Sequence, residues 1–146
     1  MTADHHDFYR WTQEQAAALT ARHFDAVDTA HVAKELELLG EGIALHLEHE
    51  VEQLVTELLV WTVTRDVWPR RRLASRIRAT RTWIRDLLRA SPSLKAAIPA
   101  LLIERYLELW HTAQSATWVP LATWPEYCPW TPEQVLDADF WPEEMR

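Results

Sequence analysis

Nine arginines stand between residues 65 and 89, and they are the side chains whose type and spacing most suggest chemistry. A guanidinium carries planar N–H donors that match the oxygens of phosphate and carboxylate groups. Arg71, Arg78 and Arg85 recur every seven residues, so a helix over 70–89 would place all three on one face. We predict that this face is an interaction surface, for an anionic partner or for acidic helices of this chain or a second copy.

The distribution of charge favours a protein partner for this surface over nucleic acid. The chain has a net charge of -7: residues 1–64 contribute -9, residues 65–89 contribute +7 and residues 90–146 contribute -5. An acidic protein repels a polyanion, and the sequence contains no recognised nucleic-acid-binding motif. Anion or nucleic-acid binding through the arginine-rich helix 70–89 is therefore our second interpretation.

A pair of histidines is the best candidate for metal chemistry. His46 and His49 are three residues apart, and Glu50 follows His46 by four, so one helix face could present all three to a metal. A di-iron bundle needs Glu-x-x-His on two helices, and this chain lacks that pair. We predict no metal and no cofactor, and a metal-dependent enzyme is only the third interpretation.

The sequence also lacks a recognisable catalytic arrangement. Cys128 lies between Tyr127 and Pro129 with no neighbouring base, which favours a packed thiol over a nucleophile. The two glycines of the chain leave little allowance for a glycine-rich phosphate loop. A lone cysteine, a polar N-terminus without signal-peptide features and the absence of a long apolar run predict a cytoplasmic protein that does not cross a membrane.

The longest periodic stretch predicts the helix that must organise the fold. Apolar residues recur at spacings of three and four over about nine turns, and Gly40 and Gly42 interrupt them, which predicts a kink or a close helix crossing. A second apolar row lies off this stripe and predicts self-association, as a symmetric dimer. The stripe consists of Val32, Leu36, Leu39, Ile43, Leu47, Val51, Leu54, Leu58 and Trp61, and the second row of Leu38, Leu45, Val55 and Leu59.

Capping patterns place the ends of other helices. Trp-Thr-x-Glu-Gln occurs at residues 11–15 and again at 130–134, which predicts Thr12 and Thr131 as N-caps with capping boxes. Helices are expected over 13–22, from about 29 to 66, where Pro69 would end the long helix, and over 70–89, 94–116 and 132–138. The Trp- and Pro-rich residues 117–130 are expected to form an arm with docked indoles. We predict one all-α domain over residues 1–146, an up-and-down bundle of about four main helices.

Several short motifs carry a resemblance to a known family. They are Asp7-Phe8-Tyr9, Leu38-Leu39-Gly40, Ser91-Pro92-Ser93-Leu94, Cys128-Pro129-Trp130-Thr131 and Asp139-Phe140-Trp141-Pro142, in this order. Together they resemble the bacterial family called domain of unknown function 29, over nearly the whole chain. The resemblance implies a small helical domain found mainly in cyanobacteria and proteobacteria, with no established activity. In the family a His often stands at the position of Glu57, and a Trp at that of Leu73.

Taken together, these patterns predict a protein-interaction or accessory module and not an enzyme. The expected partner is a second copy of the chain or another protein.

Overall fold

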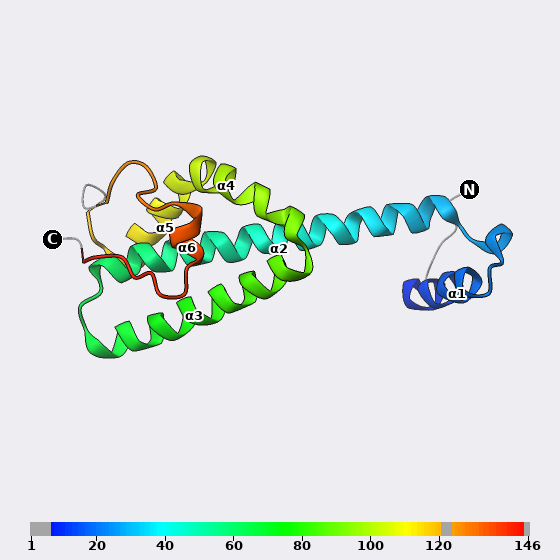
Figure 1. The fold of residues 1–146 in the computed structure, drawn as a ribbon, viewed down its shortest axis with the longest axis horizontal. Coiled ribbons are helices and arrows are strands. Elements are labelled where there is room, and N and C mark those ends of the chain that lie inside the picture. Colours follow the sequence, from blue (N-terminus) through cyan, green and yellow to red (C-terminus); the bar gives the residue numbers. More distant parts are fainter. Residues whose placement is uncertain (1–6, 121–123, 145–146) are drawn as a thin grey trace. The chain divides into compact units, whose positions relative to one another are not determined.

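The computed structural model describes residues 7–120 and 124–144, and within them the fold is all-α, as predicted. Six α-helices and two 3-10 helices follow one another, and no strand occurs among these residues (Figure 1). None of the helices in this part of the chain combines the length and the apolarity needed to cross a membrane. The elements are α1 (Phe8–Thr20), η1 (Phe24–Ala26), α2 (Thr29–Val63), α3 (Val67–Ala90), η2 (Pro92–Ala97), α4 (Ile98–Glu104), α5 (Tyr106–Thr117) and α6 (Pro132–Leu136).

Contacts within the chain define two compact units. The first unit is Met1–Ile43 and the second is Ala44–Arg146, so the boundary falls inside α2. The single domain over 1–146 stays a prediction.

The first unit begins with a helix that starts earlier than the sequence pattern predicts. The Asp7 carboxylate accepts a hydrogen bond from the backbone N–H of Arg10 at 2.9 Å, and this N-cap starts α1 at Phe8. Thr12 therefore lies inside α1, where its hydroxyl donates to the carbonyl of Tyr9 at 2.7 Å, and the predicted Thr12 cap is wrong. Asp is a stronger N-cap residue than Thr, so the earlier position prevails.

Helix α2 continues without a break through its two glycines. A Cβ atom added at Gly40 or at Gly42 would meet no atom within 4 Å. The close helix crossing predicted at these glycines is thus not made by the described residues, while the kink stays a prediction. The N-terminus of α2 is capped by Asp28, whose carboxylate lies 3.3 Å from the backbone nitrogen of His31.

The core of the second unit lies between the second half of α2 and the helices that follow it. Both apolar rows are buried in this half of α2, because Leu54 and Leu58 of the main stripe and Val55 and Leu59 of the second row have no exposed surface. Val55 and Leu59 are therefore internal, and their predicted role in self-association is wrong. They pack in one cluster with Ile77 and Ile84 of α3, Leu102 of α4 and Leu109 of α5.

The helix boundaries around Pro69 and Arg105 differ from the predictions, and α6 ends at Leu136 instead of residue 138. Helix α2 ends at Val63, and Pro69 lies in the first turn of α3, where a missing N–H has no effect on the helix. The helix predicted over 94–116 is divided into η2, α4 and α5, with a bend at Arg105. Pro99 lies in the first turn of α4, the position at which a proline was expected to be tolerated.

Only some of the tryptophan side chains in the C-terminal arm, residues 117–130, pack against the helices. Trp124 is buried, and its Nε1–H donates to the hydroxyl of Thr62 at 3.0 Å. Trp118 is 91% exposed with a φ of 58°, so the prediction that it docks is wrong. Thr131 caps α6 with both bonds of a capping box, as predicted. Helix α6 contacts both α3 and α4, and in Figure 1 the C-terminal segment that follows α6 is drawn in red.

Candidate anion-binding surface on α3

The sequence of α3 divides it into an apolar face and a basic face. Leu73, Ile77 and Ile84 are buried, and the same periodicity leaves Arg71, Arg78 and Arg85 exposed, on the side where the sequence placed them. Successive members of this arginine set stand two turns apart, about 10 Å along the helix axis. The three arginines therefore do not converge on one point, and their role as an interaction surface stays a prediction.

Indole rings support the basic face at its N-terminal end. The guanidinium carbon of Arg70 lies 4.0 Å from the ring centroid of Trp61, and that of Arg78 lies 5.1 Å from the ring centroid of Trp141. The rings of Trp61 and Trp141 are themselves 4.5 Å apart. Cation–π contacts of this kind restrict long arginine side chains to defined positions.

A shallow depression of about 350 Å³, wide open to solvent, lies beside these rings, and we call it the arginine cavity. It is lined by Trp61, Arg65, Val67, Arg70, Arg71, Ala74 and Arg78. Arg70 forms an ion pair with Glu144 and donates to the carbonyl of Thr64 at 2.9 Å. The other three guanidiniums, of Arg65, Arg71 and Arg78, have no carboxylate within 4.0 Å in the described part of the chain.

Two other arginines of α3 have structural roles that the sequence analysis missed. Arg81 is buried, and it donates from Nε to the carbonyl of Val135 and from Nη1 to that of Phe140, both at 2.8 Å. Burial lowers the pKa of Arg81, and the charge of Asp137 opposes this effect. Arg81 lies three residues before Ile84 and four after Ile77, and this position on the apolar face is the signal that could have revealed it.

The second missed arginine pairs with a buried acid. Nη2 of Arg76 lies 2.6 Å from Oε1 of Glu57, which also accepts a hydrogen bond from the Gln53 amide at 3.3 Å. Burial raises the pKa of the Glu57 carboxyl, and the charge of Arg76 partly offsets the increase.

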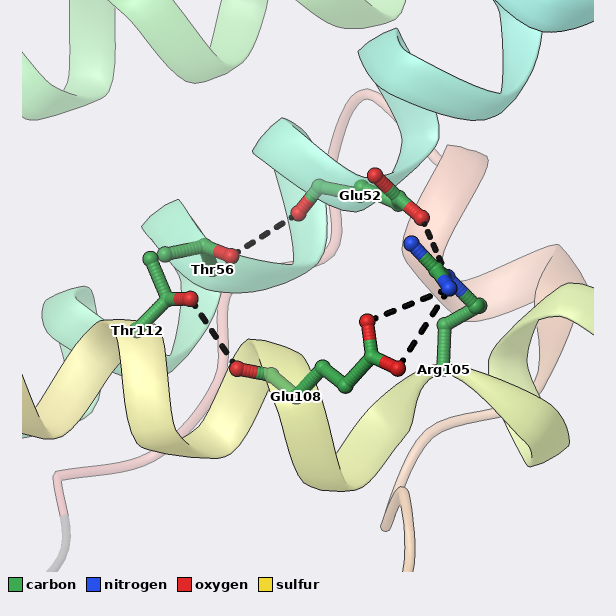
Figure 2. A network of polar contacts seen from close by, with 5 residues as sticks. All are labelled: Glu52, Thr56, Arg105, Glu108 and Thr112. Carbon is green, nitrogen blue, oxygen red and sulfur yellow. Dashed lines mark hydrogen bonds and ion pairs between the residues drawn. The ribbon is translucent and has the colours of Figure 1, made fainter.

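Arg105, which lies outside α3, connects α2 to α5 through two carboxylates. Nε of Arg105 donates to Glu52 of α2 at 2.8 Å, while Nη1 lies 3.1 Å from the carboxylate of Glu108 in α5 (Figure 2). The hydrogen bond to Glu52 raises the pKa of Arg105. Because both acids are engaged in this network, it joins α2 to the bend between α4 and α5.

The candidate metal ligands and the cysteine have other surroundings. The His46 ring packs on Trp83 with centroids 4.4 Å apart, and its Nε2 lies 3.4 Å from Glu50. In the ranges 7–120 and 124–144, no group of three or more potential ligands is close enough to hold a metal. Burial raises the pKa of the Cys128 thiol, whose Sγ lies 3.5 Å from the carbonyl of Trp130, which makes it a poor nucleophile at neutral pH.

The described residues thus form an all-helical domain with a basic face on α3. The family model described as domain of unknown function DUF29 matches residues 5–141, and the chain belongs to that family. No curated protein and no solved structure matches the chain significantly.

Proposed function

We propose that this protein is an interaction module that forms a homodimer through the first half of α2. The observation that supports the proposal is an exposed apolar row with the spacing of a two-helix seam. Leu36, Leu39 and Ile43 are 63%, 62% and 37% exposed, and with Val32 they follow one another at intervals of four, three and four. Such intervals bring apolar side chains to one edge of a helix, where a second helix can cover them.

The two glycines of α2 support this choice of surface. On a helical projection Gly40 and Gly42 fall on either side of the apolar row, and each faces open space. Glycine within a helix costs about 1 kcal/mol relative to alanine. Since no neighbour in the described chain requires these glycines, the close approach of a second helix provides a reason for them.

Three of the charged residues of this segment lie away from the row, whereas Glu35 flanks it beside Leu39. Lys34 and Glu37 form an ion pair with 3.4 Å between Nζ and Oε2, and Glu41 projects from the same side of the helix. Leu38 and Leu45 also lie on that opposite side. A second copy could therefore pack on the row without bringing Glu37 and Glu41 against their counterparts.

Sedimentation equilibrium at micromolar concentration tests the proposal. We expect a mass of twice the 17.1 kDa chain for the native protein and monomers for the double variant Leu36→Gln/Leu39→Gln. The matched control Leu38→Gln/Leu45→Gln removes two leucines of comparable exposure and should remain dimeric. A monomeric native protein, or equal dissociation of the two variants, would refute the proposed seam; circular dichroism verifies that both variants are helical.

We rank nucleic-acid binding through α3 as the alternative, below the interaction module. It is supported by the unpaired guanidiniums of Arg65, Arg71 and Arg78 at the arginine cavity. Retention on DNA and RNA across a salt series tests it, because phosphate contacts release counterions and weaken steeply as salt increases. We expect the native protein to show negligible retention near 0.15 M salt. If it binds tightly at that salt concentration, and the variant Arg71→Gln/Arg78→Gln/Arg85→Gln does not, nucleic-acid binding becomes the first-ranked function. A cytoplasmic location is part of both proposals.

A further inference from the structure

We propose that the arginine cavity binds the phosphoryl group of a small phosphorylated molecule. This inference is independent of dimer formation, because it concerns the second unit and not the first half of α2. It starts from a surplus of positive charge. Three of the four guanidiniums that line the cavity have no acidic partner among the described residues, whereas Arg76, Arg85 and Arg89 of the same helix each have one.

The arginines are positioned for binding before any ligand arrives. Arg70 and Arg78 lie over the faces of Trp61 and Trp141, and Arg71 lies 5.9 Å from the ring centroid of Trp68. The N–H donors of a guanidinium lie in its plane, so an indole against its face leaves the donor edges available. Side chains held in this way lose less conformational entropy on binding than free ones do.

The donor type favours a phosphoryl group over a single carboxylate. A phosphate presents three oxygens and close to two negative charges and can accept from more than one guanidinium, whereas a carboxylate presents two oxygens and one charge. One carboxylate, that of Glu144, already pairs with Arg70 at this site. The remaining guanidiniums then offer more donors than a second carboxylate could use.

The size of the cavity favours a small molecule over a polyanion. Its volume of about 350 Å³ is near the lower end of the range for small-molecule sites. The screening length at physiological salt is about 8 Å, so a ligand of this size responds mainly to the arginines around it. A polyanion extends beyond the cavity and is exposed to the acidic remainder of a chain with a net charge of -7.

Calorimetric titration with inorganic phosphate, pyrophosphate and acetate tests the proposal. Inorganic phosphate and pyrophosphate distinguish free phosphate from a phosphoryl group carried by a larger molecule. We expect pyrophosphate to bind more tightly than phosphate and acetate to bind weakest. Arg71→Gln/Arg78→Gln should weaken pyrophosphate binding by about 10-fold or more, since each charge-assisted hydrogen bond contributes roughly 1.5–3 kcal/mol.

The matched control is Arg85→Gln/Arg89→Gln, which removes the same charge from the same helix at two arginines paired with Asp86. It should bind pyrophosphate nearly as the native protein does. Equal losses of pyrophosphate affinity in the two double variants would show that only the general positive charge of α3 attracts the anion, which would refute the site. The site is also refuted if neither phosphate nor pyrophosphate binds at millimolar concentration. Tighter binding of a single-stranded oligonucleotide than of pyrophosphate would also overturn it, in favour of nucleic acid. Arg65 lies between α2 and α3 and not in a helix. The variant Arg65→Gln should therefore also weaken pyrophosphate binding, without any change to α3.

Discussion

The carboxylate of Glu57 and the guanidinium of Arg76 lie 2.6 Å apart, but the Glu57 side chain is 5% exposed and that of Arg76 is 62% exposed. The pair therefore joins a desolvated acid to a hydrated base. Oε2 of Glu57 is buried without a hydrogen-bond partner among the described residues. The ionised acid is thus only partly compensated, which agrees with its raised pKa.

We predict that the free energy of unfolding of the Glu57→Gln variant increases relative to that of the native protein as the pH rises. A folded-state pKa above the ordinary 4.5 means that the folded chain holds this proton more tightly than the unfolded chain. The stability due to the protonated acid is complete below the ordinary pKa and is lost as the pH rises through the raised folded-state pKa. Urea unfolding of both proteins between about pH 4 and pH 8 measures the difference.

Arg76 provides the control for this experiment. Arg76→Gln removes the charge that favours ionised Glu57, so it should destabilise the protein by about 1 kcal/mol at neutral pH, a value that allows for the exposure of Arg76. The loss should disappear at low pH, where Glu57 is protonated. A difference between Glu57→Gln and the native protein that does not depend on pH would contradict the assigned shift.

Arg81 should contribute strongly to stability although it belongs to the basic helix. Arg81→Met keeps the aliphatic stem but removes the bonds to the carbonyls of Val135 and Phe140, leaving both acceptors without this donor. We expect a loss of about 2–3 kcal/mol in the free energy of unfolding and faster proteolysis of the segment after α6. Arg85→Met is the control, and its exposed side chain should contribute less than about 0.5 kcal/mol. Equal effects of the two substitutions would show that Arg81 does not hold this segment.

The two copies of the capping pattern should differ in their effect on stability. Thr131→Ala removes the acceptor for the backbone N–H of Gln134 and should cost about 1 kcal/mol. Thr12→Ala removes only a hydroxyl that donates within α1, and its effect should stay below about 0.5 kcal/mol. Asp7→Ala, which removes the true cap of α1, should resemble Thr131→Ala. Chemical denaturation gives all three values, and a larger loss at Thr12 than at Asp7 would contradict the observed helix start.

The caps show how far local sequence predicts this fold. The same five-residue pattern begins a helix at Thr131 and lies inside one at Thr12, because Asp7 offers an earlier and better cap. Periodicity correctly predicted the apolar face of α3 and the exposure of Arg71, Arg78 and Arg85. These features depend on residues within a few turns of one another, where spacing and hydrogen-bonding capacity decide the outcome.

The features that the sequence did not predict depend on distant partners. The acceptors of Arg81 lie 54 and 59 residues away along the chain, and the indole of Trp124 meets a hydroxyl 62 residues away. An arginine that donates to backbone carbonyls looks identical in sequence to a hydrated one. The arginine cavity was missed for the same reason, because Trp141 supports it from the other end of the chain.

The uneven packing of α2 has a consequence for how this one helix opens. From Leu47 to Thr62 its apolar side chains belong to a closed core, whereas the apolar residues between Leu36 and Leu45 are largely open to solvent. Helical hydrogen bonds alone give little protection in water, and packing supplies most of it. In the monomeric variant Leu36→Gln/Leu39→Gln, amide hydrogens should therefore exchange with deuterium slowly in the second half of this 35-residue helix and much faster in the first. A single element of secondary structure then contains two regions of different local stability.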